Sequence, residues 1–352
     1  MYNTKTTLGL DIGGAHLKAV LLKKDKETIL SNATILRTPL WQGLKSLEDH
    51  LLDIKKKWYI NGGTKVVCTM TGEMADFFDN RQEGVNRISQ VIFSVFGSKI
   101  YFYSTSGLTR SLHSSLRKKI IASANWHATA SIISKLIPSC LIIDVGSTTT
   151  DIIPIRDHRV LTPEKSSDHQ RLQTGELVYV GINRTPICSI ANTLIFRAST
   201  VNVTREFFAS TSDIFRLTGD LKEKFDFYPA CDGKIKSKTG SQKRLARMIG
   251  LDLSDAKEKE WIGLARNLKG IILEELIINL KKVLNHYRIS NNCLLILSGS
   301  GIFLGSELAK KLQCPSQNIS ETFNHVLSIK PELKEFSEIC APSVSIALLS
   351  IL

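Results

Sequence analysis

The sequence predicts a two-lobed α/β protein, and three observations carry this prediction. The chain has 352 residues, a length that suggests two domains. The stretch 140–153, CLIIDVGSTTTDII, is typical of a buried strand, a turn of small and hydroxyl residues, and a second strand. A near copy, LGLDIGGAHLKAVLL, stands at 8–22. Two such units about a lobe's length apart suggest facing halves around a central cleft.

The boundary between the lobes is expected near Pro138, which ends a helical stretch just before the second unit. We therefore expect a first lobe at 1–137 and a second at 138–340. A small apolar helix at 341–352, started by Pro342, is expected to pack back on the first lobe.

The first half of the chain alternates strands and helices. Its first strand ends at Asp11, turns through Gly13 and Gly14, and returns over 17–22. Glycines at the turn allow positive φ and a close approach of the backbone to a ligand. The other elements expected in this half are strands at 66–71 and 100–103 and helices at 86–96 and 120–136.

The second half is less regular. Residues 207–219 look polar and loop-like, and a short basic helix at 243–249 ends near Gly250. Ser254 is a good N-cap for a long helix whose apolar residues recur at a spacing close to 3.6. A buried strand at 294–297 then opens into the glycine turn SGSG before another helix.

Composition favours a folded, soluble, cytoplasmic protein: 43% of the residues are hydrophobic and 22% are charged. No secretory signal is visible, since the first apolar run is interrupted at Asp11. No uncharged stretch reaches the roughly 20 residues of a spanning helix, so no membrane partner is expected. The seven cysteines are scattered without a C-x-x-C pair, which argues against a disulfide framework and a structural zinc site.

The formal net charge is +13, from 46 Lys and Arg against 33 Asp and Glu. A nucleic-acid surface would need these charges clustered on one face. The basic residues are instead spread along the chain, without an aromatic-interleaved strand motif. We therefore expect no nucleic-acid partner, and anionic small molecules as ligands.

The turns after the two apolar runs suit a phosphate group beside a divalent metal. Their backbone N–H groups and hydroxyls can bind the anion while carboxylates hold Mg²⁺, partly through water. The predicted metal ligands are Asp11, Asp144 and Asp151. The predicted diphosphate- or nucleotide-binding residues are Gly13, Gly14, Lys18, Gly146, Ser147, Thr148, Thr149, Gly299 and Gly301. For either aspartate alone, capping of a turn or helix is the alternative, and for SGSG it is a simple helix-entry turn.

Three residues are candidate general bases: Glu73, Glu176 and His16. Each glutamate has the alternative of capping a helix or pairing with Arg184, and His16 that of an ordinary loop histidine. Asn125, in a helix of small residues, and Arg184 are assigned to substrate binding. A buried structural amide is the alternative for Asn125.

Two Asp-x-Gly loops, a late glycine loop and a terminal small helix together resemble the actin, sugar kinase and Hsp70 superfamily, with its ribonuclease H-like ATPase fold. Within it, DVGSTTTD at 144–151 is similar to the hydantoinase A/oxoprolinase family. The blocks that resemble its methanofuran-biosynthesis branch, linked to tetrahydromethanopterin-dependent one-carbon transfer, are DIGGAHLK (11–18), TMTGEMAD (69–76), RQEGV (81–85), NWHATA (125–130), IIDVGSTTTDIIPI (142–155), GELVYVGINRTPI (175–187), SDIFRLTGD (212–220) and RLARMIGLD (244–252).

This resemblance implies an alkyl-transferring synthase of methanofuran-type cofactor formation. Such an enzyme joins an aminomethyl-furanmethyl diphosphate to the phenol oxygen of γ-glutamyltyramine and releases diphosphate. The phosphate loops would then hold diphosphate, with Mg²⁺ as the implied cofactor. The alternative is an ATP-dependent kinase or hydantoinase-like amidohydrolase that uses the same loops for ATP. Ala15, Leu17 and Lys18 stand where hydantoinases usually have threonines and an aspartate, which disfavours ATP-dependent ring opening.

Overall fold

The computed structural model describes residues 5–98, 100–110, 121–164 and 166–352. They form two compact units. Unit 1 takes in the chain up to Leu141, together with Ile153–Asp168 and Gln317–Leu352, and unit 2 takes in Ile142–Ile152 and His169–Ser316. The predicted domain boundaries stay a prediction, because compact units defined by contacts need not coincide with domains.

Unit 1 is built on a six-stranded mixed sheet. In spatial order its strands are β3 (Thr28–Arg37), β2 (His16–Lys24), β1 (Lys5–Ile12), β4 (Lys65–Met70), β5 (Ile100–Ser104) and β6 (Gly107–Thr109). β1 pairs antiparallel with β2 and parallel with β4. Leu8, Leu10 and Ile12 of this central strand are fully buried, as expected for a strand covered on both faces. The strand–turn–strand predicted at the N-terminal end is confirmed.

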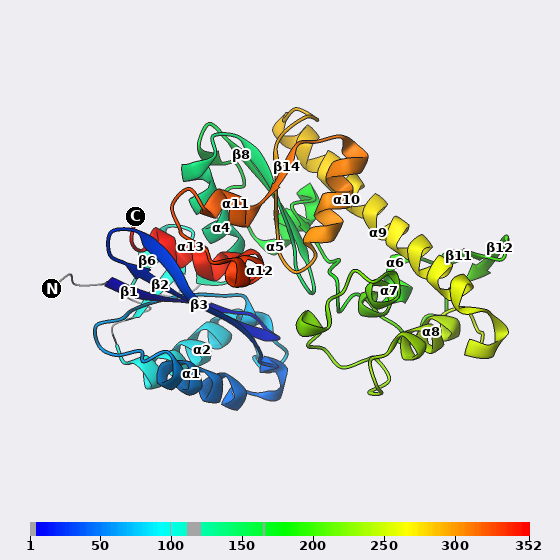
Figure 1. Ribbon diagram of the computed structural model, residues 1–352, viewed down its shortest axis with the longest axis horizontal. Helices are drawn as coiled ribbons and strands as arrows, with labels where there is room; N and C mark the ends of the chain where they lie inside the picture. Colours follow the sequence, from blue (N-terminus) through cyan, green and yellow to red (C-terminus); the bar gives the residue numbers. More distant parts are fainter. Residues whose placement is uncertain (1–4, 99, 111–120, 165) are drawn as a thin grey trace. The chain divides into compact units, whose positions relative to one another are not determined.

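Helices cover both faces of this sheet, with α1 and α2 on one face and α13 on the other (Figure 1). The helices of unit 1 are α1 (Lys45–Lys57), α2 (Arg81–Phe96), α4 (Asn125–Leu136), α11 (Ile319–Phe323), α12 (Pro331–Ile339) and α13 (Ala341–Leu349), with 3₁₀ turns η1 (Leu40–Gln42) and η2 (Gly72–Met74). The closing helix begins with Pro342 in its first turn, as predicted.

α13 approaches the sheet closely because glycine and small residues meet there. A Cβ on Gly9 would lie 2.3 Å from the backbone oxygen of Ser343. The Ser343 hydroxyl also donates a hydrogen bond to the Lys18 carbonyl, at 3.1 Å. This helix therefore holds β1 and β2 directly.

The helix predicted at 120–136 is interrupted: Ile121 is helical, residues 122–124 are not, and α4 begins at Asn125. Residue 120 lies outside the described residues. Ser123 has φ +50, the left-handed conformation, which interrupts the helical backbone just before Asn125.

The second sheet contains the strand–turn–strand predicted at 140–153. In spatial order its strands are β10 (Leu177–Val178), β8 (Thr150–Arg156), β7 (Cys140–Val145), β13 (Leu295–Ser298) and β14 (Ser316–Asn318), and β9 (Arg159–Val160) pairs with β8. The amide of Gly146 donates to the carbonyl of Thr149 at 2.8 Å, which closes the turn between β7 and β8.

The remaining elements lie between β8 and β14 in the sequence. They are α5 (Asp168–Thr174), α6 (Ile187–Ile190), the hairpin β11 (Thr193–Phe196) and β12 (Ser199–Asn202), α7 (Thr211–Thr218), η3 (Glu223–Phe225), α8 (Lys238–Arg247), η4 (Leu253–Asp255), α9 (Glu258–Tyr287) and α10 (Ile302–Leu312). The long helix α9 is confirmed, but Lys257 is its N-cap and Ser254 lies in η4. Lys257 takes this place because its backbone and Glu260 form a capping box.

The prediction of a loop over 207–219 was wrong for most of that stretch, which contains α7. A capping box between Ser210 and Asp213 starts this helix. The buried carboxylate of this helix, Asp213, is paired with two arginines. Asp213 is 1% exposed, and its Oδ1 atom accepts from Arg244 (2.8 Å to Nη2) and from Arg216 (3.1 Å).

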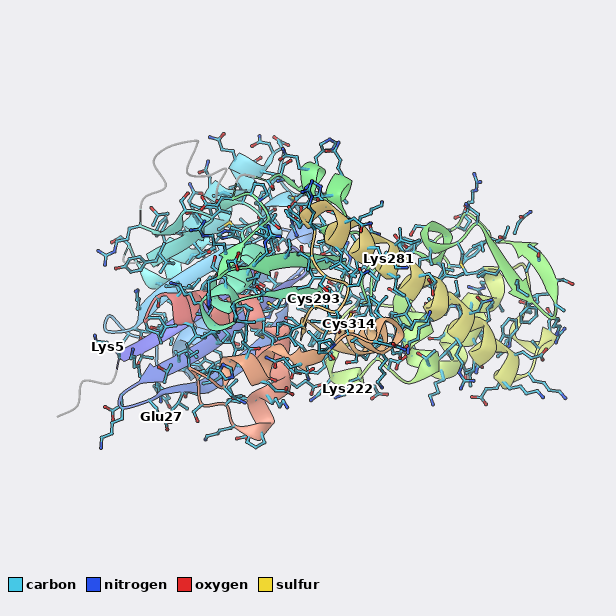
Figure 2. The ribbon with its side chains drawn as sticks, turned by 90° about the horizontal axis from the view of Figure 1, so that it is seen from above. Lys5, Glu27, Lys222, Lys281, Cys293 and Cys314 are labelled. Atoms are coloured by element: carbon cyan, nitrogen blue, oxygen red, sulfur yellow. The ribbon has the colours of Figure 1, made fainter. Side chains whose placement is uncertain are left out.

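All seven cysteines are free thiols, in agreement with the prediction from their spacing. Cys293 and Cys314, labelled in Figure 2, precede β13 and follow α10 respectively. In the described part of the chain, no helix has both the length and the apolar character needed to cross a bilayer.

Candidate functional site

The first candidate site in unit 1 lies where β1 and β4 end. These strands are parallel, with Asp11 opposite Thr69, so the loops that follow them leave the same edge of the sheet. The amide of Thr71 donates to the Ile12 carbonyl at 2.9 Å. A Cβ on Gly72 would lie 3.1 Å from the carbonyl of Gly13. The blocks DIGGAHLK and TMTGEMAD are thus brought together.

Lys5 and Glu27 mark the opposite end of this sheet, where β1 begins and β2 turns into β3 (Figure 2).

Asp11 is a buried carboxylate opposite a lysine. It faces Lys18 across β1 and β2, with 3.9 Å between Oδ2 and Nζ. Its Oδ1 atom is buried and has no hydrogen-bond partner among the described residues. Burial raises the pKa of Asp11, although the charge of Lys18 acts in the opposite direction. An unsatisfied buried carboxylate oxygen of this kind can serve as a cation ligand.

The glycine turn after Asp11 is tight. The Gly13 amide donates to the His16 carbonyl at 2.9 Å, and a Cβ on Gly13 would lie 3.2 Å from that oxygen. Neither Gly13 nor Gly14 has a positive φ, so the turn does not use the left-handed conformation that glycine allows. Close backbone packing accounts for Gly13, while a Cβ on Gly14 would meet nothing within 4 Å in the described structure.

Glu73 is the most enclosed of the three candidate bases. Its side chain is fully buried, and its Oε1 atom accepts a hydrogen bond of 2.9 Å from the Ser123 hydroxyl. Its Oε2 atom has no partner among the residues that the structure describes. Burial raises the pKa of Glu73, against smaller lowering effects that include the Ser123 hydroxyl. A Cβ on Gly84 would lie 2.4 Å from the Glu73 carbonyl, so α2 fixes this residue from the other side.

Asn125 is the first residue of α4 and is half-buried. Its side-chain oxygen accepts from the Trp126 amide at 2.7 Å, and its role in substrate binding stays a prediction. Two residues on, His127 Nδ1 lies 2.9 Å from the Tyr103 hydroxyl. Burial lowers the pKa of His127 to about 4 and raises that of Tyr103 to about 12. This neutral pair was not predicted.

The second candidate site, in unit 2, is built on the β7–β8 turn. The glycine loop after β13 packs directly on it. Gly299 has φ +89, and a Cβ there would lie 2.4 Å from Asp144 Oδ1 and 2.3 Å from the Val145 carbonyl. The Gly301 amide donates to the same carbonyl at 2.8 Å. The SGSG loop and the DVGSTTTD loop are therefore neighbours, as an anion-binding role for both requires.

A third loop closes over the β7–β8 turn. A Cβ on Gly181 would lie 2.4 Å from the Thr148 amide nitrogen, and the Arg184 amide donates to the Ser147 carbonyl at 3.1 Å. The Ser147 hydroxyl is 3.1 Å from the Tyr228 hydroxyl, and the exposed Arg184 guanidinium lies 5.6 Å from the centre of that ring. Tyr228 was missed because nothing in the sequence around it marks it. Gly181 could have been found within the block GELVYVGINRTPI.

Two predicted site residues are engaged in structural contacts. Asp151 forms an ion pair with the buried Arg171. Glu176 accepts at Oε2 from the Thr174 hydroxyl (2.6 Å) and at Oε1 from the Tyr287 hydroxyl (2.9 Å), which ties it to α9. The described ranges contain no group of three or more His, Cys, Asp or Glu side chains that could hold a metal ion.

The chain belongs to the hydantoinase/oxoprolinase family, whose model matches residues 65–329. It is 30% identical over 342 residues to the (4-{4-[2-(gamma-L-glutamylamino)ethyl]phenoxymethyl}furan-2-yl)methanamine synthase of Methanocaldococcus jannaschii, covering 97% of this chain and 96% of that protein. It is 32% identical over 211 residues to the protein of the same name in Methanococcus vannielii, covering 60% of this chain and 90% of that one.

Among solved structures, nucleotide-free acetone carboxylase resembles this chain with a TM-score of 0.54 at 9% sequence identity, over 89% of this chain and 68% of that one. At this identity the likeness concerns the fold alone. Two compact α/β units agree with the two-lobed α/β fold predicted from the paired Asp-x-Gly loops.

Proposed function

We propose that this protein is a synthase of methanofuran-type cofactor formation. It joins an aminomethyl-furanmethyl diphosphate to the phenol oxygen of γ-glutamyltyramine and releases diphosphate, as a transferase of alkyl or aryl groups other than methyl. The observation that carries the proposal is the similarity over 97% of the chain to a protein named for such a product. That name contains an ether between a phenol oxygen and a furan-bound CH₂ group, which is the bond that this reaction forms.

The chemistry chiefly requires stabilisation of a leaving diphosphate. A furan ring stabilises positive charge on its attached CH₂ group, so the C–O bond to diphosphate can break as the phenol oxygen forms the new bond. Preorganised N–H donors and cations lower the energy of the departing anion. Within unit 2, we assign this task to the three glycine-bearing loops.

Mg²⁺ is the cation that such a substrate implies, because it is bound in proteins through one or two carboxylates together with phosphate oxygens. In unit 1, the unsatisfied Oδ1 atom of Asp11 fits this requirement. Within unit 2, Asp144 lies beside the glycine loop of Gly299 and is the candidate carboxylate of that unit. Asp151 does not fit, since Arg171 neutralises it. When bound, the ion would neutralise part of the diphosphate charge.

Glu73 is our choice for the general base that takes the phenol proton. An ordinary phenol has a pKa of about 10 and needs a base near neutral pH. Glu73 has a raised pKa and a buried oxygen without a described partner, whereas both carboxylate oxygens of Glu176 accept from hydroxyl groups. His16 lies in the adjacent turn and is the second choice.

The test is a reaction of the purified chain with Mg²⁺, aminomethyl-furanmethyl diphosphate and γ-glutamyltyramine. We expect diphosphate and the ether product in equal amounts, measured by a phosphate assay and by mass spectrometry. Folded protein that releases no diphosphate would refute the proposal. Steady hydrolysis of ATP, or phosphoryl transfer from it, without any furan compound would instead support the kinase or amidohydrolase alternative.

A further inference from the structure

An unusual backbone conformation lies beside the proposed base. Ser123 has φ +50, a left-handed conformation that glycine adopts without strain and that costs other residues free energy. It stands between Ile121, which is helical, and the start of α4 at Asn125. Glycine would adopt this φ at a lower cost in free energy. The presence of serine therefore suggests that its side chain has a role.

The hydrogen bond between Ser123 and Glu73 indicates this role. The Ser123 hydroxyl donates to Glu73 Oε1 at 2.9 Å, across 50 positions of the sequence. The carboxylate is otherwise enclosed, with its Oε2 atom lacking a partner in the described part of unit 1. On the backbone side, Gly84 of α2 packs closely on Glu73, since a Cβ on Gly84 would lie 2.4 Å from the Glu73 carbonyl. The Ser123 hydroxyl is thus the hydrogen-bond donor that orients the Glu73 carboxylate.

We propose that Ser123 is a positioning residue for the synthase reaction, holding one carboxylate oxygen of Glu73 so that the other is presented to the acceptor phenol. This inference rests on the proposed function. Hydrogen bonding by Ser123 also favours the charged form of Glu73, so it keeps the pKa of this buried acid from rising further. The left-handed backbone is retained because it carries the hydroxyl to this place.

Two substitutions separate the hydroxyl from the backbone. Ser123→Ala removes the hydroxyl and keeps the strained φ, whereas Ser123→Gly removes the hydroxyl and relieves the strain. We expect both to lower kcat about tenfold with little change in KM, and to move the acidic limb of the kcat profile about one pH unit upward, as expected for loss of one hydrogen bond to a charged group. Ser94→Ala, which removes an exposed hydroxyl bonded within α2, is the matched control and should leave kcat and the pH profile unchanged.

Stability measurements test the pair without any turnover. Ser123→Ala should alter the pH dependence of the free energy of unfolding in the native background, and should have a smaller effect when Glu73 is already Gln. This double-mutant cycle still decides the question if the synthase assay fails, so failure of the inference and of the proposed function can be told apart. Native kcat and pH profile in Ser123→Gly, or equal effects of Ser123→Ala in both backgrounds, would overturn the inference.

Discussion

Two buried carboxyl groups dominate unit 1 at the scale of single residues. Asp11 lies near the end of β1 and Glu73 in η2, just after the neighbouring strand β4, and burial raises the pKa of each. Each also keeps one oxygen without a hydrogen-bond partner in the described residues. Since a buried polar atom without a partner is unfavourable, such atoms are expected where a ligand completes the site.

Replacement of Glu73 by Gln should lower kcat about 100-fold or more, since a positioned general base contributes about 10²–10⁴-fold. Because the pKa of Glu73 is raised, we expect the acidic limb of the native profile above the ordinary glutamate range, and its disappearance in Glu73→Gln. Steady-state kinetics against pH check this. A Glu73→Gln enzyme with native kcat would assign the base elsewhere, with His16→Asn as the next variant to measure.

The same substitution should stabilise the protein. The pKa of Glu73 is higher in the folded than in the unfolded chain, so between these two values the folded chain binds more protons. The free energy of unfolding therefore falls as pH rises through this window. Above it, Glu73→Gln should unfold at higher temperature than the native protein, and below it the two should be alike. Calorimetry at several pH values measures this; a lower Tm at neutral pH would contradict it.

Residue by residue, the sequence predicted those features that depend on local pattern alone. An aspartate that ends an apolar run before a glycine turn is the pattern that made Asp11 and Asp144 candidate metal ligands, a role that stays a prediction. The role of Ser123 could not be predicted, because no local sequence pattern indicates a left-handed conformation at a residue other than glycine. The pairing of Asp151 with Arg171 was equally hidden, since it depends on how α5 packs on β8.

Among the elements, α2 is the one that sets the position of Glu73. A Cβ at Gly84 would lie 2.4 Å from the Glu73 carbonyl. Gly84→Ala should therefore lower the free energy of unfolding by about 1–3 kcal/mol, as overpacking does, and should lower kcat as well. Gly270→Ala in α9 is the matched helical control, because a Cβ there meets nothing within 4 Å in the described structure. It should raise stability by up to about 1 kcal/mol. Urea unfolding compares the two, and equal effects would contradict the packing argument.

The glycine loop after β13 offers a second matched comparison. Gly299 and Gly250 both have positive φ, +89 and +72, so alanine strains the backbone at either position. Only at Gly299 would the new Cβ also collide with Asp144 and Val145. Gly299→Ala should lower kcat/KM about ten- to a hundredfold through misplacement of the loop, while Gly250→Ala should retain it. A comparable loss of kcat/KM in both variants would show that backbone strain, not the collision with Asp144 and Val145, causes the effect.

Elements with strong periodicity were predicted well, and those stabilised by distant pairing were not. The apolar spacing of α9 and the alternation around β1 are local properties. Helix α7 contains a buried carboxylate, Asp213, whose partner Arg244 lies on α8. A polar segment of that kind is indistinguishable from a loop until its partners are known.

For the whole molecule, ligand binding should appear as added stability. Inorganic diphosphate with Mg²⁺ should raise the Tm, by the equivalent of about 2.7 kcal/mol at 100 times Kd. Thermal unfolding with diphosphate, with ATP and with sulfate, each with Mg²⁺, measures this preference. A larger shift with ATP than with diphosphate would favour the kinase or amidohydrolase alternative.

The packing of α13 on β1 and β2 affects how unit 1 folds during synthesis. The Ser343 hydroxyl and the Lys18 carbonyl that it contacts are 325 positions apart. At about 5–20 residues per second, the ribosome releases these strands tens of seconds before the helix that covers them. Throughout that interval the sheet lacks the helix that packs on β1, β2 and β4. Unit 1 thus acquires its final packing late in synthesis.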